Sequence, residues 1–146
     1  MQVDFYHLTA TPLARALPQI AARVVADGGR LLIVTGNDER RTELDRLLWT
    51  YAADSFLPHA ERGAGDDAAQ PVLLAPDAVA TNGARFVAIV DGDWRDAALG
   101  FDRAFHFFDD ERIRKARLAW KGLADHAEVE RRYWKQNDTG RWEQAT

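Results

Sequence analysis

The sequence contains no cysteine among its 146 residues. Disulfide bonds, zinc–thiolate sites and thiol nucleophiles all need cysteine, so this absence excludes three kinds of stabilising or catalytic chemistry together. The fold must therefore rest on packing and hydrogen bonding. Because 47% of the residues are hydrophobic, a chain of this length can bury one continuous core, and we expect a single domain over residues 1–146.

Long hydrophobic runs are also missing. A membrane-spanning helix needs roughly 20 apolar residues, and no stretch of the sequence approaches that length. Residues 1–7 alternate like a strand and lack the basic region and apolar run of a signal peptide.

The net charge is −4 and the isoelectric point is near 5.5. We therefore expect a soluble, cytoplasmic protein that reaches DNA only indirectly, because proteins that hold nucleic-acid phosphates are usually basic.

Apolar periodicity predicts alternating strands and helices. The expected elements are strands at 3–8, 30–34, 72–74, 85–90 and 101–108, helices at 13–26, 39–51 and 112–123, and a short helical turn within 91–99. Pro58 predicts a compact non-helical segment at 55–59, and the glycines of 61–70 predict a loop. This order is typical of an α/β fold, a three-layer Rossmann-like domain with a mostly parallel sheet flanked by helices. Residues 130–146 either pack on that domain or extend from it.

Phosphate-binding glycines are absent from the turns where this fold would carry them. The turn Leu8 to Pro12 has no glycine, and the turn Val34 to Asp38 has one glycine, with an acidic residue two positions after it. No P-loop motif occurs. The alternative interpretation is a stand-alone nucleotide-binding or nucleotide-processing enzyme. The absence of phosphate-binding glycines argues against it.

Other catalytic groups are scattered. The four histidines, His7, His59, His106 and His126, show no metal-binding spacing. Asp91 and Asp93 flank a glycine after a strand, which is an ordinary turn pattern. We expect no catalytic residue, no cofactor and no metal.

The helix predicted at 112–123 concentrates positive charge in an acidic protein. Arg114, Arg117 and Lys121 fall on neighbouring parts of one face at helical spacing, and Trp120 lies beside them. The simplest interpretation of this helix alone is a solvated face with an inward tryptophan.

Two further aromatic residues, Trp49 at a helix end and Phe56 in the following loop, change that interpretation. Combined with the basic helix, they could line an apolar pocket rimmed by cations. Such a pocket suits a short acidic peptide that ends in a hydrophobic residue, whose carboxylate would accept a bidentate arginine bond.

Several segments resemble the chi subunit of bacterial DNA polymerase III in order and spacing. The matching segments are Phe5-Tyr-His-Leu8, Arg30-Leu-Leu-Ile-Val34, Leu44-Asp-Arg-Leu-Leu-Trp49 followed by Ser55-Phe-Leu-Pro-His59, and Ala116-Arg-Leu-Ala-Trp-Lys121. The resemblance covers nearly the whole chain. It departs from the family at Trp120, where tyrosine is common, and at Ile113, where some members carry a basic residue that Arg112 or Arg114 would replace here.

The resemblance implies a non-catalytic adaptor in DNA replication. By it, the chain binds the acidic C-terminal tail of single-stranded-DNA-binding protein and pairs with a psi subunit or another clamp-loader component. It further implies that the tail's last residue enters a pocket near Trp49, Phe56 and Trp120, and that Arg117 accepts the tail's carboxylate, with Arg114 and Lys121 nearby. A direct DNA binder is a third interpretation, which the basic helix supports and the net negative charge opposes.

Overall fold

The computed structural model describes residues 1–50 and 57–145 of the chain. Its elements are β1 (Gln2–His7), α1 (Leu13–Ala26), β2 (Leu31–Val34), α2 (Asp38–Thr50), β3 (His59–Glu61), β4 (Val72–Ala75), β5 (Phe86–Ile89), β6 (Arg103–Phe108), α3 (Ile113–Leu123), β7 (Glu130–Gln136) and β8 (Trp142–Gln144), with short 3-10 helices at Asp67–Ala69, Asp96–Gly100 and Asp110–Arg112. The expected strands and helices agree with these bounds to within about two residues, and α1 matches its expected bounds. The expected end of the second helix at residue 51 lies outside the described residues, and β3, β7 and β8 were not expected as strands. Ser55 and Phe56 lie outside the described residues.

The strands form one sheet in the order β3-β4-β2-β5-β6-β1-β7-β8. All neighbouring strands pair in parallel except β7 and β8, which pair antiparallel. Residues 130–136 thus join the sheet through β1 rather than extending away. Among the described residues, no helix is long and apolar enough to cross a membrane.

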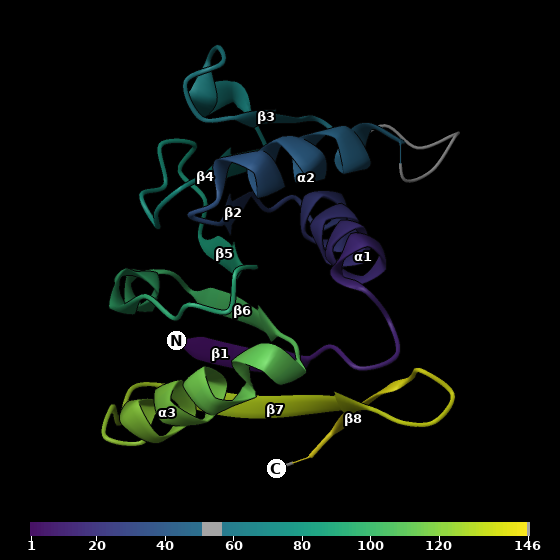
Figure 1. Cartoon of the computed structure of the whole chain (residues 1–146). Coiled ribbons are helices and arrows are strands. Elements are labelled where there is room, and N and C mark those ends of the chain that lie inside the picture. Colours follow the sequence, from purple (N-terminus) through teal and green to yellow (C-terminus); the bar gives the residue numbers. More distant parts are fainter. Residues whose placement is uncertain (51–56, 146) are drawn as a thin grey trace.

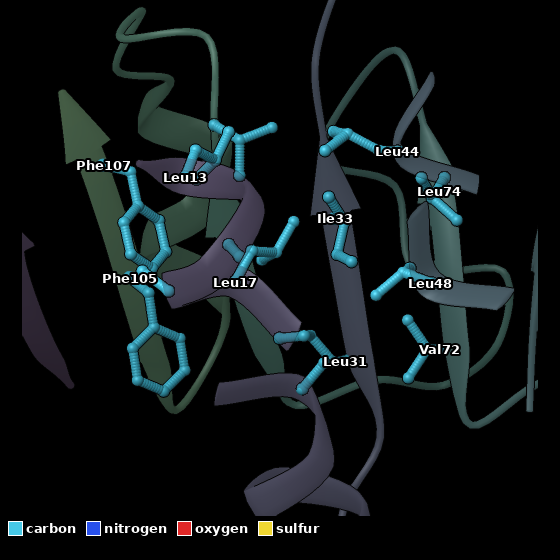
Figure 2. Packing of buried hydrophobic residues seen from close by; sticks show 14 of the residues in the cluster. Leu13, Leu17, Leu31, Ile33, Leu44, Leu48, Val72, Leu74, Phe105 and Phe107 are labelled. Atoms are coloured by element: carbon cyan, nitrogen blue, oxygen red, sulfur yellow. The ribbon is translucent and has the colours of Figure 1, made fainter. Parts of the chain in front are cut away.

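Two hydrophobic layers cover opposite faces of the sheet. Successive strand residues alternate between them because side chains in a strand point to opposite sides. One layer packs α1 and α2 on the sheet, with Leu13, Leu17, Leu44 and Leu48 against the strands, as Figure 2 shows. The other layer packs α3 on the opposite face through Ala116 and Leu123. This confirms the three-layer α/β fold, and Figure 1 shows α1 and α2 together at a distance from α3.

A buried carboxylate joins three strands of the sheet. Asp4 of β1 is fully buried and accepts hydrogen bonds from Arg103 Nε of β6 at 2.6 Å, Trp134 Nε1 of β7 at 3.0 Å and Gln2 Nε2 at 2.9 Å. An ionised carboxylate is stable away from water only when such donors surround it. The network therefore holds β6, β1 and β7 in register.

The left-handed turn at Gly28 ends α1. Gly28 has φ of 83°, and the next amide, that of Gly29, donates to the carbonyl of Val24 at 2.8 Å. Glycine adopts this conformation without the steric cost that a Cβ brings. The turn sends the chain directly into β2.

A histidine without hydrogen-bond partners among the described residues lies in the core layer that packs α3 on the sheet. Both ring nitrogens of His106 are buried and have no hydrogen-bond partner in the described part of the chain. The ring is enclosed by Phe5, Trp94 and Phe108 at centroid distances of 5.2, 5.7 and 6.0 Å. Burial lowers the pKa of His106 from 6.5 to about 4, because the charged imidazolium would lose its hydration.

Replacing His106 with leucine should stabilise the protein. At pH 7.5 the variant should gain roughly 1–2 kcal/mol in unfolding free energy, because two unpaired polar atoms leave the core. Between pH 6.5 and pH 4 the unfolded chain binds a proton at His106 that the folded protein does not. The free energy of unfolding is therefore unaffected by His106 titration above pH 6.5 and falls as the pH drops towards 4. Urea unfolding at pH 7.5 and pH 5 should therefore show the gap between H106L and the unmodified protein widen by about 2 kcal/mol at pH 5. A constant gap would show that His106 does not titrate in this way.

Candidate peptide-binding groove

A cavity of about 350 Å³ lies between α3 and β7, on the face of the sheet opposite α1 and α2. Figure 1 shows α3 lying over this part of the sheet, near β1 and β7. We call this cavity the α3–β7 groove. It is lined by His7, Ile113, Arg117, Trp120, Lys121, Tyr133, Lys135 and Ala145.

The apolar floor of the α3–β7 groove is built on Trp120. Its ring meets Phe5 edge to face at 5.2 Å and Tyr133 at 5.9 Å. The Arg131 guanidinium lies over the indole, with Cζ 4.3 Å from the ring centroid, and Arg131 Nη1 donates to the Trp120 carbonyl at 2.6 Å. These contacts hold the half-buried indole in one orientation, with part of its surface left open to the groove.

Three exposed cations lie around the groove, and one carboxylate, Asp110, contacts its lining through His7 Nε2 at 2.7 Å. Arg117, Lys121 and Lys135 are exposed and form no ion pair with any carboxylate of the described residues. Burial raises the pKa of Tyr133, the positive charge of Arg117 lowers it, and the negative charge of Asp110 raises it, so both charged groups act on the phenol. An apolar floor rimmed by free cations favours an anionic ligand with a hydrophobic end.

The groove contains only part of the predicted site. Arg117, Trp120 and Lys121 come together as expected. Arg114 is exposed on α3 and does not line the groove, and Arg112 lies near Asp93, with 3.7 Å between Nη1 and Oδ1.

Trp49 lies on the other side of the sheet. It belongs to α2, whose buried residues pack in the layer opposite α3, and its ring contacts His59 at a centroid distance of 4.5 Å. Its side chain is 51% exposed. The structure therefore does not bring Trp49 to the groove, and Phe56 lies outside the described residues.

Sequence reasoning missed the contribution of β7. Tyr133 and Lys135 point to the same face as Arg131 because alternate residues of a strand share a side. The alternation Arg131, Tyr133, Lys135 was visible in the sequence. Its partner strand, β1, is more than 120 residues away in the sequence, so the pairing itself was not.

The crevice at the carboxyl ends of β2 and β5 is where sheets of this type bind nucleotides. A cavity of about 290 Å³ opens there. The Asp91 carboxylate occupies the anion position, accepting from the Gly36 amide at 2.9 Å and from both Nη atoms of Arg95 at 2.9 and 2.7 Å. Burial raises the pKa of Asp91, but these hydrogen bonds outweigh burial and hold it below its usual value. Asp91 therefore closes a turn. The cavity's other charged lining residues are two carboxylates, Asp109 and Glu111, and two cations, Arg40 and Arg112, so the lining carries no excess of positive charge for a phosphate.

Fold and groove together define a class: a three-layer α/β protein with a mostly parallel sheet, no phosphate-binding loop and an aromatic, cationic groove under its third helix. The family model of the DNA polymerase III chi subunit, HolC, matches residues 1–129, and the chain belongs to this family. The matched residues include α3, while β7 and β8 follow them.

Two curated relatives support the assignment. DNA polymerase III subunit chi of Pseudomonas aeruginosa is 35% identical over 78 residues, which are 50% of this chain and 52% of that protein. DNA polymerase III subunit chi of Escherichia coli K12 is 37% identical over 57 residues, which are 39% of each chain. The chain thus spans about half the length, or less, of these relatives.

Arg131 should matter more for stability than its neighbour Arg132. Replacing Arg131 with methionine removes the bond to the Trp120 carbonyl and the stacked cation, and should lower the unfolding free energy by roughly 1–2 kcal/mol. Arg132→Met removes an exposed pair with Glu130 and should cost about 0.5 kcal/mol or less. Urea unfolding of both variants measures the difference. Equal losses would mean that Arg131 does not hold Trp120 in place.

Proposed function

We propose that this protein is a non-catalytic accessory subunit of the bacterial DNA polymerase III holoenzyme in DNA replication. In this proposal the α3–β7 groove binds the acidic C-terminal tail of single-stranded-DNA-binding protein. The observation that carries the proposal is the open apolar floor at Trp120 beside three cations without carboxylate partners among the described residues. Membership of the chi family supports the link to replication.

The groove chemistry suits the end of an acidic peptide. A terminal apolar side chain would pack against Trp120, Ile113 and Tyr133, and its carboxylate would accept hydrogen bonds from Arg117. Arginine suits this role because its planar guanidinium can hold both carboxylate oxygens at once. Lys121 and Lys135 would attract acidic residues that precede the terminus, through weaker and salt-sensitive interactions.

Binding at this groove leaves the α1–α2 face available for a second partner. That partner would be a psi subunit or another clamp-loader component, which would connect the chain to the holoenzyme. Trp49 lies on that side and cannot contact the residue that packs on Trp120. DNA is reached through the partner protein, in agreement with a net charge of −4.

Arg117→Ala should weaken binding of the tail peptide about thirty-fold. Loss of a charge-assisted bond beside an apolar anchor costs roughly 2 kcal/mol, and the unmodified protein should bind with a Kd on the order of micromolar because the flexible tail becomes ordered. Isothermal calorimetry with the free-acid peptide measures both values. Arg114→Ala is the matched control, because it removes the same charge from the same helix outside the groove, and it should change affinity less than three-fold.

Amidation of the peptide's C-terminus completes a double-mutant cycle. It should weaken binding to the unmodified protein by a similar factor and add little once Arg117 is replaced, because both changes remove one interaction. Equal binding of the amide and the free acid to the unmodified protein would refute the assignment of Arg117 to the carboxylate. A complete absence of binding would refute the proposed function.

A further inference from the structure

A second cavity, of about 280 Å³, opens on the α1 face of the sheet. The proposed function does not use it. It lies beside the C-terminal end of α1, above β5, β6 and β1, and its lining residues are Tyr6, Ile20, Arg23, Val24, Asp27, Gly28, Gly29, Phe86, Arg103 and Phe105. We call it the α1–β6 cavity.

Aromatic and aliphatic side chains form the inner wall of this cavity. Tyr6 and Phe105 stand next to each other on β1 and β6, with ring centroids 6.2 Å apart, and Phe86 of β5 lies partly exposed beside them. Ile20 and Val24 of α1 add apolar surface. Pockets of this kind bind flat apolar groups, which aromatic walls contact over a large area.

One arginine is fixed at the wall of the cavity. Arg103 Nε donates to the buried Asp4 carboxylate, and Arg103 Cζ lies 4.6 Å from the Phe105 ring centroid. The guanidinium also acts on the Tyr6 hydroxyl by charge and hydrogen bonding, and its only carboxylate partner among the described residues is Asp4. A guanidinium held by one nitrogen and stacked on a ring presents its other donors in a set direction, at little further entropic cost.

A second arginine has no partner at all among the described residues. Arg23 is exposed on α1, lines the cavity and lies close enough for its charge to act on Tyr6. Burial and the Asp4 charge raise the pKa of Tyr6 and outweigh the opposite effects of Arg103 and Arg23, so its hydroxyl stays protonated at neutral pH. Asp27, also at the rim, forms no ion pair with Arg23.

We propose that the α1–β6 cavity binds a small aromatic carboxylate. The ring packs against Tyr6, Phe86 and Phe105, and the carboxylate lies between the Nη atoms of Arg103 and the guanidinium of Arg23. A phosphate monoester of the same size would carry a second charge, which Asp27 and the buried Asp4 disfavour. The cavity and the α3–β7 groove lie on opposite faces of the sheet, so this site is independent of tail binding.

The test is a titration of the ¹⁵N-labelled protein with 2-naphthoate, followed by amide chemical shifts. The amide resonances of Gly28 and Gly29, which line the cavity, should shift and saturate with ligand concentration. A Kd on the order of 1 mM is expected, because a ligand with few atoms can make only a limited number of contacts. The neutral 2-naphthamide should bind about ten-fold more weakly, because it lacks the charge that the arginines recognise.

Variants on α1 make the charge argument specific. Arg23→Gln should weaken naphthoate binding about five-fold, while Arg15→Gln, the same change at another exposed position of α1, should leave it unaltered. Asp27→Asn should strengthen binding, because it removes a repelling carboxylate from the rim. All three positions are exposed, so the fold should persist.

Equal binding of the acid and the amide would overturn the proposal. Equal effects of Arg23→Gln and Arg15→Gln would also overturn it, and so would shifts confined to the Trp120 indole. A peptide ending in phenylalanine should not displace naphthoate, and displacement would assign the cavity to a chain terminus instead of a small molecule. Failure of peptide binding at Trp120 leaves these readouts unchanged, so the two proposals fail separately.

Discussion

The buried carboxylate of Asp4 is the interaction on which both candidate sites depend. It lies at the centre of β1 and gathers donors from β6 and β7, two strands that β1 separates. A charge in that position would be costly if any of these donors were missing. The network thus constrains which strands flank β1 and in which register.

The two consequences of this network appear on opposite faces of the sheet. Through Trp134 it fixes β7, whose alternate residues Tyr133 and Lys135 form one wall of the α3–β7 groove. Through Arg103 it directs a guanidinium into the α1–β6 cavity. A single carboxylate therefore positions an aromatic-cationic site on each face, although no side chain is shared between the two.

Much of the fold could be predicted from the sequence because its signals are local. The bounds of α1 follow from helical spacing that ends at Asp27 and Gly28, and the apolar run of β2 is typical of a strand covered on both faces. The three-residue strand β3 was missed because it is too short to show a period and follows Pro58. The strand order was not predicted in detail, since it depends on pairings such as β1 with β7 that join distant segments.

The candidate site was predicted only where it is local. Arg117, Trp120 and Lys121 lie on one helix at spacings of three and four residues, so their proximity follows from helix geometry. The sequence shows that Trp49 is aromatic and near a helix end, and neither property indicates which face of the sheet it lies on. The face of the sheet that α2 covers is set by the handedness of its crossover, which separates Trp49 from the groove. Residue type alone could not show that Trp49 and Trp120 lie on opposite faces of the sheet.

Binding of the tail at Trp120 can be tested by following the indole N–H resonances of the protein while adding the acidic tail peptide. The Trp120 indole should shift progressively with peptide concentration, because the terminal side chain packs against its exposed edge, while the Trp49 indole on the far face should not move. A shift of Trp49 without any shift of Trp120 would contradict tail binding at the α3–β7 groove and place it on α2.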